Sequence, residues 1–123
     1  MLYPFPPTCG SSSPWGPIQT VEALGPDAVC VTTASHGGLR LSQASWGRLP
    51  EPIRKTAYSD NGWFEEDCDW ALPYLALGLD AFEADAARAA ELHQAAVRTV
   101  QRFHPALAVQ LGVAPPETGR SDG

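Results

Sequence analysis

Long hydrophobic runs and cysteines are scarce in this sequence. No apolar stretch approaches the roughly 20 residues that a helix needs to span a bilayer. The opening stretch MLYPFPPTCGSSSPWGP lacks the basic start and continuous apolar core of a secretory signal peptide. The three cysteines, Cys9, Cys30 and Cys68, are an odd number and form no CxxC pair, which argues against a disulfide framework or a structural zinc site. We therefore expect a cytoplasmic protein that needs no membrane, disulfide, metal or cofactor.

Positive charge is also scarce, and its distribution is uneven. The chain has 8 Lys and Arg against 14 Asp and Glu, a net charge of −6. From Thr56 to Ala87 there is no Lys or Arg, whereas eight acids fall there: Asp60, Glu65, Glu66, Asp67, Asp69, Asp80, Glu83 and Asp85. Direct binding to nucleic acid requires the opposite bias. An acidic protein can instead occupy the basic groove of a nucleic-acid-binding partner.

The length of 123 residues predicts a single domain. Residues 1–17 are rich in Pro, Ser and Gly and predict a flexible arm, whose apolar residues could still dock on the domain or on a partner. Residues 18–112 form the predicted globular domain, and residues 113–123 the predicted disordered tail.

The N-terminal half carries the strand signals. Residues 18–24 suit a strand or a short helix, residues 28–34 are rich in β-branched residues, and residues 39–42 alternate. We expect the last two segments to form a β-hairpin in which Gly37 and Gly38 supply positive φ.

The C-terminal half carries the helix signals. Ser42 is the expected N-cap of a short helix that ends before Pro50, a helical turn is expected at 51–55, and residues 58–62 predict a turn or loop. A helix is expected from about Phe64, with acids at its start, and the strongest helix spans 81–103 with Asp80 as its N-cap. The predicted fold class is α+β: a small antiparallel sheet packed against a helical C-terminal half.

The stretch GWFEEDCDWA places four acids between two tryptophans. Three interpretations fit it: the solvated first turn of a helix, a partner-binding surface anchored by aromatic rings, or a metal site. On a helix, Glu65 and Asp69 would share a face, but no ExxH or HxxxE partner lies nearby, so metal binding is not favoured. The candidate partner-binding residues are Glu65, Glu66, Asp67, Asp69, Trp63 and Trp70.

The stretch SHGG, comprising Ser35, His36, Gly37 and Gly38, is the second candidate site. It reads as a tight turn, as a loop whose backbone N–H groups bind an anion, or as part of a catalytic site in which His36 acts with Glu66 or Asp67. Cys68 between two acids predicts a raised thiol pKa, which argues against a thiol enzyme. His104, before Pro105, is interpreted as a helix-end residue.

The segments WGP (15–17), TASHGGLRLS (33–42) and GWFEEDCDWA (62–71), in this order, resemble a family of short bacterial proteins and domains carried by plasmids, phages and integrative elements, known as a domain of unknown function. The resemblance covers roughly Pro14 to Phe82 and implies a mobile-element setting without an established activity. The positions that match its motifs are Ser35, His36, Gly37, Gly38, Glu65, Glu66, Asp67 and Trp70.

Three functional hypotheses follow. The first is a small acidic inhibitor of a nucleic-acid-handling host defence complex, comparable to an anti-CRISPR protein, which binds a basic groove through its acids. The alternative is a small enzyme with a His36/Glu66 site for a nucleotide or another anionic substrate. The third is an oligomerisation module in which the 81–103 helix forms a homodimer face.

Overall fold

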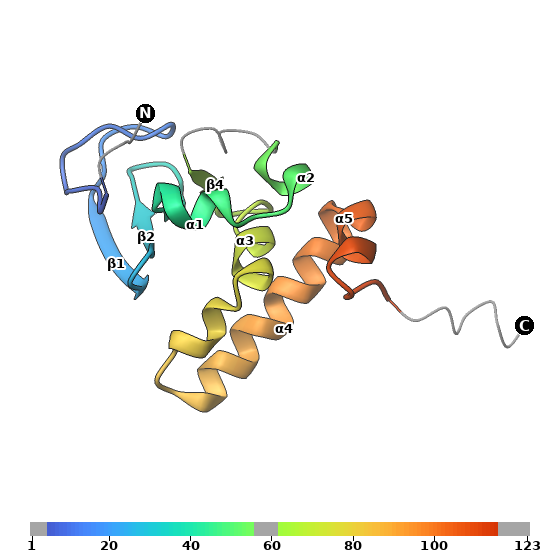
Figure 1. Cartoon of the computed structure of the whole chain (residues 1–123). Coiled ribbons are helices and arrows are strands. Elements are labelled where there is room, and N and C mark those ends of the chain that lie inside the picture. The colour runs from blue at the N-terminus through green and yellow to red at the C-terminus, as the bar shows by residue number, and fades with distance from the viewer. Residues whose placement is uncertain (1–4, 56–61, 116–123) are drawn as a thin grey trace, which may run out of the picture.

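A computed structural model describes residues 5–55 and 62–115 (Figure 1). Four strands form an antiparallel sheet in the order β1 (Thr20–Gly25), β2 (Ala28–Thr32), β3 (Gly37–Leu41) and β4 (Trp63–Glu65). Two short helices, α1 (Gln43–Gly47) and α2 (Glu51–Arg54), lie between β3 and β4 in the chain. The C-terminal half contains α3 (Ala71–Ala76), the 3-10 helix η2 (Leu79–Phe82), α4 (Ala86–Phe103) and α5 (Pro105–Gln110). The predicted α+β class is confirmed.

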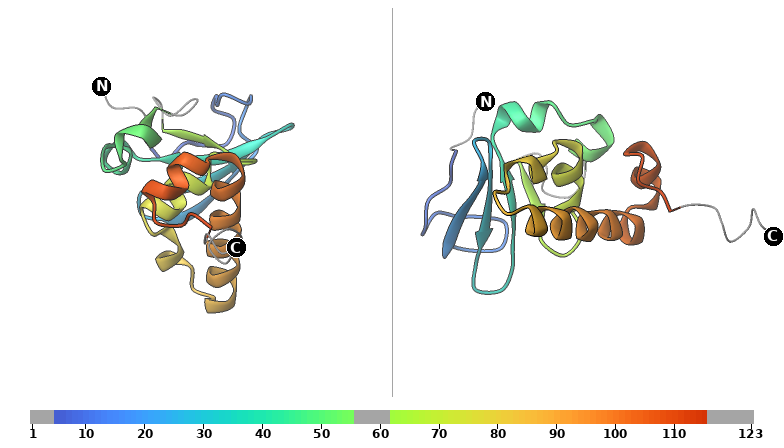
Figure 2. Two further views of the ribbon diagram at one scale, coloured as in Figure 1. Left: turned by 90° about the vertical axis from the view of Figure 1, so that its right-hand side faces the viewer. Right: turned by 90° about the horizontal axis from the view of Figure 1, so that it is seen from below.

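The two faces of the sheet are covered by different parts of the chain (Figure 2). Because successive strand residues point to opposite faces, Ala28, Leu39, Leu41 and Phe64 face the helices and enter the main core. Core residues from α3 and α4 meet them there, namely Ala71, Leu72, Ala96 and Val100. Because other parts of the chain cover both faces of the sheet, every residue of β3 is buried.

The opposite face of the sheet is covered by the N-terminal segment. Val31 and Trp63 lie on this face, and the Trp15 ring meets Trp63 edge-on with 5.6 Å between ring centroids. Two backbone hydrogen bonds fix the segment: Gly10 N–H donates to Ile18 O at 2.8 Å, and Ile18 N–H donates to Ser11 O at 2.9 Å. Residues 5–17 therefore dock on the domain. The described residues do not include residues 1–4, most of the turn expected at 58–62 or most of the tail expected at 113–123.

The expectation that Gly37 and Gly38 supply positive φ in a hairpin turn is wrong. Both glycines lie inside β3, opposite Thr32 and Val31 of β2, and neither is among the glycines with positive φ. The turn is instead built by Thr33, whose Oγ1 accepts the His36 N–H at 3.0 Å and donates to the His36 carbonyl at 2.8 Å. The glycines are required by space, because a Cβ on Gly38 would overlap the Phe64 carbonyl oxygen and lie 2.6 Å from the Trp15 ring.

The segment expected to be helical from Phe64 is also different. Residues Trp63–Glu65 form β4, residues 66–70 turn, and helix α3 begins only at Ala71. Pairing with β3 at the edge of the sheet overrides the predicted helix here, since Phe64 pairs with Leu39 and fills the core with 0% exposure.

The long helix begins later than expected. Its N-cap is Asp85, whose Oδ1 accepts the N–H groups of Ala87 and Arg88, so the assignment of Asp80 as N-cap is wrong. Within the segment 81–103, Ala96 and Val100 are buried, whereas Phe82 and Phe103 are 53% and 50% exposed. By contrast, Ser42 is confirmed as the N-cap of α1, since its Oγ accepts the Ser45 N–H. None of the helices in the described ranges is long and apolar enough to cross a membrane.

Candidate functional site

The acids of GWFEEDCDWA lie in the turn between β4 and α3, and we call Glu65–Asp69 the acidic turn. The Glu65 carbonyl accepts the N–H groups of Asp69 at 3.0 Å and Trp70 at 2.9 Å, which closes the turn. The Glu65 side chain also accepts the Asp67 N–H at 3.0 Å. The prediction that Glu65 and Asp69 share a helix face is wrong, because the backbone here is a strand followed by a turn.

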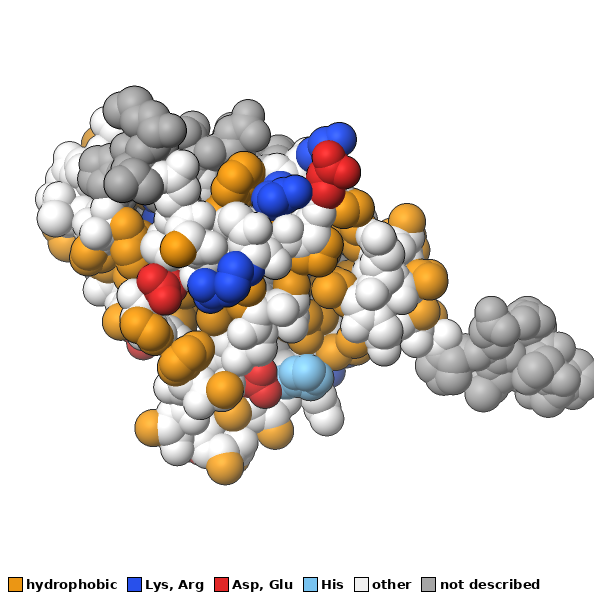
Figure 3. Space-filling view, viewed as in Figure 1, with side chains coloured by type: hydrophobic (Ala, Val, Ile, Leu, Met, Phe, Trp, Pro, Cys, Tyr) orange, Lys and Arg blue, Asp and Glu red, His pale blue; other side chains and the backbone are white. Residues whose placement is uncertain are grey.

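The four acids have different surroundings. Glu66 and Asp67 are exposed, Glu65 is partly buried, and Asp69 is only 7% exposed. Among the described residues, the acidic turn makes ion pairs only with histidines: His36 Nδ1 lies 3.8 Å from Glu65 Oε2, and His104 Nε2 lies 3.1 Å from Asp69 Oδ1. Glu66 and Asp67 form the exposed part of the acidic turn, and no lysine or arginine of the described residues forms an ion pair with either carboxylate. The face drawn in Figure 3 shows only scattered acidic side chains.

The two tryptophans that flank the acids also have different roles. Trp63 is 4% exposed, because strand alternation turns it under the N-terminal segment, and the Arg40 guanidinium lies 4.2 Å from its ring centroid. Burial removes Trp63 and Asp69 from the proposed partner-binding surface. Trp70 is half-buried and packs edge-on against Tyr74 at 5.4 Å between centroids.

Of the three interpretations of the SHGG stretch, the backbone pairing of its glycines does not favour the anion-binding loop. Gly37 and Gly38 are paired with β2, and Gly38 is also paired with Glu65 of β4, so their backbone belongs to the interior of the sheet. Ser35 and His36 are exposed at the end of the hairpin. His36 approaches the acidic turn, where its ring nitrogen, a Glu65 oxygen and an Asp67 oxygen lie within 4.8 Å of one another.

A pocket of about 210 Å³ opens beside the acidic turn, between the sheet and the helices. Its walls are mostly apolar, and its charged lining residues are Glu22, Glu66 and Arg88. Arg88 already has an anionic partner, because its Nε lies 3.3 Å from Glu83 Oε1. Burial raises the pKa of the Cys30 thiol in the pocket, and the carboxylates of Glu22 and Glu66 raise it further. Among the described residues, His36 does not line this pocket, so the structure does not combine His36 and Glu66 in one cavity.

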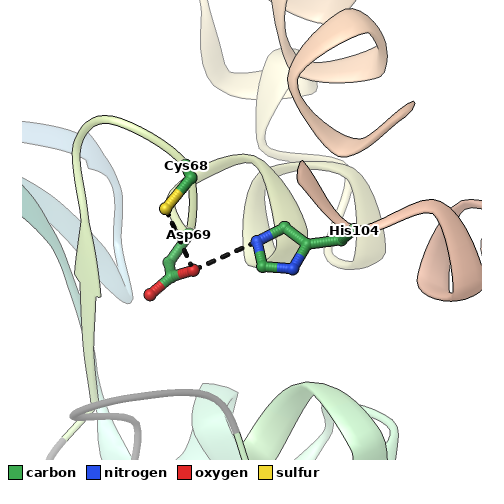
Figure 4. A group of neighbouring side chains, drawn as sticks. All are labelled: Cys68, Asp69 and His104. Atoms are coloured by element: carbon green, nitrogen blue, oxygen red, sulfur yellow. Dashed lines mark hydrogen bonds and ion pairs between the residues drawn. The ribbon is translucent and has the colours of Figure 1, made fainter. Parts of the chain in front are cut away.

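A third group of side chains joins the acidic turn to the end of α4 (Figure 4). Cys68 Sγ lies 3.5 Å from Asp69 Oδ1, and the same oxygen lies 3.1 Å from His104 Nε2. Desolvation raises the pKa of Cys68 to about 12, together with the charges and hydrogen bonds of Asp69 and Glu65. The direction agrees with the sequence prediction, but burial is the main cause of the raised pKa, and the acids that contribute are Asp69 and Glu65 instead of Asp69 and Asp67. A largely protonated thiol is a poor nucleophile.

Sequence reasoning missed Glu22, Arg88 and His104 as site residues. Glu22 and Arg88 reach the pocket from β1 and α4, segments that no local pattern relates to the acidic turn. One sequence signal marked His104, namely the following Pro105. Proline disfavours the α conformation of the residue before it, so a helix usually ends there. The His104 φ and ψ of −137° and 58° leave the helix and turn the imidazole back toward Asp69.

Comparison with known proteins gives one family. No curated protein and no solved structure matches the chain. A family model described as a domain of unknown function, DUF7007, matches residues 8–114. This match is longer than the stretch from Pro14 to Phe82 that contains the family motifs. Because that match covers most of the chain, the protein belongs to the DUF7007 family.

Proposed function

We propose that this protein is a stoichiometric binding protein that receives a basic segment of another protein at the pocket and at the exposed acids beside it. The observation that carries the proposal is that Glu22 and Glu66 line a mostly apolar pocket, and that the exposed Asp67 follows Glu66 in the chain. Of the six partner-binding residues predicted from the sequence, the proposed surface keeps Glu66, Asp67 and Trp70. It also includes Glu22.

The charges of the pocket favour a cationic side chain. Arg88, the cation among the described lining residues, is engaged by Glu83, whereas the ion pairs of the described residues leave Glu22 and Glu66 without a basic partner. A lysine or arginine carries a long apolar stem and a charged end. Its stem would lie on the Trp70 and Tyr74 rings, which favours arginine in particular because guanidinium groups stack on aromatic faces.

The size of the pocket agrees with a single side chain. Drug-sized ligands occupy pockets of roughly 300–1,000 Å³, and this pocket has about 210 Å³. One inserted side chain would then serve as the anchor of a wider contact, as in many protein interfaces in which few residues carry most of the binding energy. Glu66 and Asp67 would steer the approach through long-range attraction.

The partner class we propose is a nucleic-acid-handling defence complex of a bacterial host cell, inhibited by occupation of its basic groove in an anti-CRISPR-like manner. Two features support it: the excess of acids and the resemblance of the motifs to proteins of mobile elements. In this role the protein works in the cytoplasm and touches no nucleic acid directly, because its own charge repels phosphates.

The enzyme alternative is not favoured by any specific contact. His36 Nδ1 is directed to Glu65 at 3.8 Å, and Glu66 lines the pocket without His36. A homodimer through α4 likewise stays a prediction, to which the exposed Phe103 of that helix would contribute apolar surface.

The test is a quantitative binding experiment with charge-neutral variants. The tagged protein captures partners from a bacterial lysate, and the affinity of each purified partner is measured at low and at 0.5 M salt. We expect the double variant Glu22→Gln/Glu66→Gln to weaken binding at least about tenfold and to flatten its salt dependence, since buried charge pairs at interfaces couple by more than about 1.5 kcal/mol. Glu91→Gln, an exposed acid of α4 away from the pocket, is the matched control and leaves the affinity unchanged. Unchanged affinity and salt dependence in the double variant would contradict the proposal.

A further inference from the structure

Three side chains of the types that bind zinc meet where the acidic turn contacts the α4–α5 junction. They are a thiol, a carboxylate and an imidazole, from Cys68, Asp69 and His104, and one ligand atom of each lies within 4.8 Å of the other two. We propose that these residues form a binding site for one Zn²⁺ ion. This inference is independent of the proposed function, because the pocket residues Glu22 and Glu66 take no part in it.

The distances between ligand atoms suit a tetrahedral ion. With Zn–S near 2.3 Å and Zn–N and Zn–O near 2.0 Å, neighbouring ligands of one zinc ion lie about 3.5 Å apart for S and O and about 3.3 Å apart for N and O. The observed separations are 3.5 Å between Cys68 Sγ and Asp69 Oδ1 and 3.1 Å between His104 Nε2 and Asp69 Oδ1. The ligand atoms of Cys68 and His104 lie within 4.8 Å of each other, so rotation of these two side chains can bring all three atoms to coordination distance of one ion.

His104 supplies a second, independent observation. Its Nε2 is buried and has no hydrogen-bond partner in the part of the chain that the structure describes, although Asp69 Oδ1 is only 3.1 Å away. Buried polar atoms are normally satisfied, so an unsatisfied ring nitrogen beside a buried carboxylate needs a reason. A metal ion between the two atoms removes the deficit, because a neutral imidazole nitrogen and a carboxylate oxygen are both electron-pair donors.

The backbone holds the ligands in place before any ion arrives. Asp69 N–H donates to the Glu65 carbonyl at 3.0 Å, and His104 N–H donates to the Val100 carbonyl at 2.8 Å. The side chains of Asp69 and His104 are 10% and 18% exposed, so their rotamers are limited by packing. Such support is what makes a metal site rigid enough for affinity.

The three protein ligands leave the fourth position of a tetrahedral ion to a water molecule. Thiolate, imidazole and carboxylate together favour zinc over magnesium or calcium, which take oxygen ligands. On binding, Cys68 releases its thiol proton to the solvent and coordinates as thiolate.

The experiment uses the reduced full-length chain, treated with a chelator and then titrated with Co²⁺ as a spectroscopic substitute for zinc. We expect one equivalent of Co²⁺ to bind with a thiolate-to-cobalt charge-transfer band and the intense visible bands of tetrahedral cobalt, and one equivalent of Zn²⁺ to displace it. Cys68→Ser is expected to abolish the charge-transfer band and to weaken Zn²⁺ binding at least about tenfold, as even residues behind the direct ligands contribute that much. Because serine is nearly isosteric, circular dichroism of this variant should match that of the wild type.

Two control variants separate this site from other donors. Cys30→Ser removes another partly buried thiol, and His36→Gln removes the imidazole of the exposed His36/Glu65/Asp67 group. Both are expected to keep the charge-transfer band, whereas His104→Gln is expected to weaken Co²⁺ binding at least about tenfold. The proposal is overturned if the wild type shows no charge-transfer band, if Cys68→Ser keeps it, or if His36→Gln abolishes binding while His104→Gln leaves it intact.

Discussion

His104 Nε2, at the junction of α4 and α5, lies 3.1 Å from Asp69 Oδ1 in the turn after β4. This contact joins the C-terminal helices to the end of the sheet, and it places a carboxylate that is 7% exposed against the imidazole. A buried carboxylate is costly unless it is paired. We therefore expect the pair to stabilise the fold when no metal is bound, in addition to forming part of a candidate metal site.

A double-mutant cycle on this pair, in chelator, should reveal strong coupling. We expect His104→Ala and Asp69→Ala each to lower the free energy of unfolding, and the cycle to give a coupling of about 1–3 kcal/mol, because both side chains are largely buried. Urea denaturation followed by circular dichroism measures each variant. The matched control is His93 and Asp80, 3.9 Å apart with side chains 47% and 39% exposed, for which about 0–1 kcal/mol is expected. Equal coupling in the two pairs would show that Asp69 is not held as a buried charge.

The second prediction concerns the close approach at Gly38. A Cβ there would collide with the Phe64 carbonyl oxygen and the Trp15 ring, both of which are held by the core. We expect Gly38→Ala to destabilise the protein by about 1–3 kcal/mol, as overpacking in a rigid interior does. Gly47→Ala in α1 is the matched control, since a Cβ there meets nothing within 4 Å, and it should stabilise by about 0.5–1 kcal/mol. If both variants unfold at the same urea concentration as the wild type, β3 is not packed as described.

The sequence predicted those parts of the fold that depend on local interactions. Ser42 caps α1 because its hydroxyl accepts an N–H three residues along the chain, which a local pattern reveals. Gly37 and Gly38 were misread because a GG pair is a typical turn signal. Their real constraint is the proximity of Phe64 and Trp15, which only the tertiary structure supplies.

The candidate site was predicted by residue but not by geometry. Glu65, Glu66 and Asp67 do lie together, yet the segment is a strand and a turn, because Phe64 is required in the core between the sheet and the helices. The distant partners Glu22 and His104 come from β1 and from the end of α4. Sequence periodicity contains no information on such contacts.

The third prediction concerns the N-terminal segment. Trp15 packs edge-on against Trp63 on the sheet face that the N-terminal segment covers. We expect Trp15→Ala to lower the free energy of unfolding by about 2–3 kcal/mol, less than the roughly 3–5 kcal/mol for a fully buried tryptophan, because Trp15 is half-buried. Trp15→Phe keeps an aromatic ring on Trp63 and should recover most of this loss. A stability of Trp15→Ala equal to that of the wild type would mean that the segment does not contribute to folding.

The fourth prediction concerns the reactivity of Cys68. A thiol with a pKa of about 12 is far less ionised at pH 8 than a thiol at its ordinary value of 9.0, and only the thiolate is alkylated. In a Cys9→Ser/Cys30→Ser background with chelator, we expect iodoacetamide to modify Cys68 at least about tenfold more slowly in the folded protein than in the denatured one. The folded rate should keep rising with pH between about 9 and 12, the interval between the ordinary and the raised pKa, whereas the denatured rate levels off above about 9.

Asp69 provides the control for this reactivity. Burial is the largest cause of the raised pKa of Cys68, and the charge of Asp69 and its hydrogen bond come next. Asp69→Asn removes the negative charge while keeping the shape of the side chain, so the pKa should fall and alkylation at pH 8 should become faster. Asp67→Asn changes a neighbouring exposed acid that is not among the causes of the shift, and it should leave the rate unchanged. If neither variant changes the rate, burial alone suppresses the thiolate, and the carboxylate beside the sulfur has no influence on its chemistry.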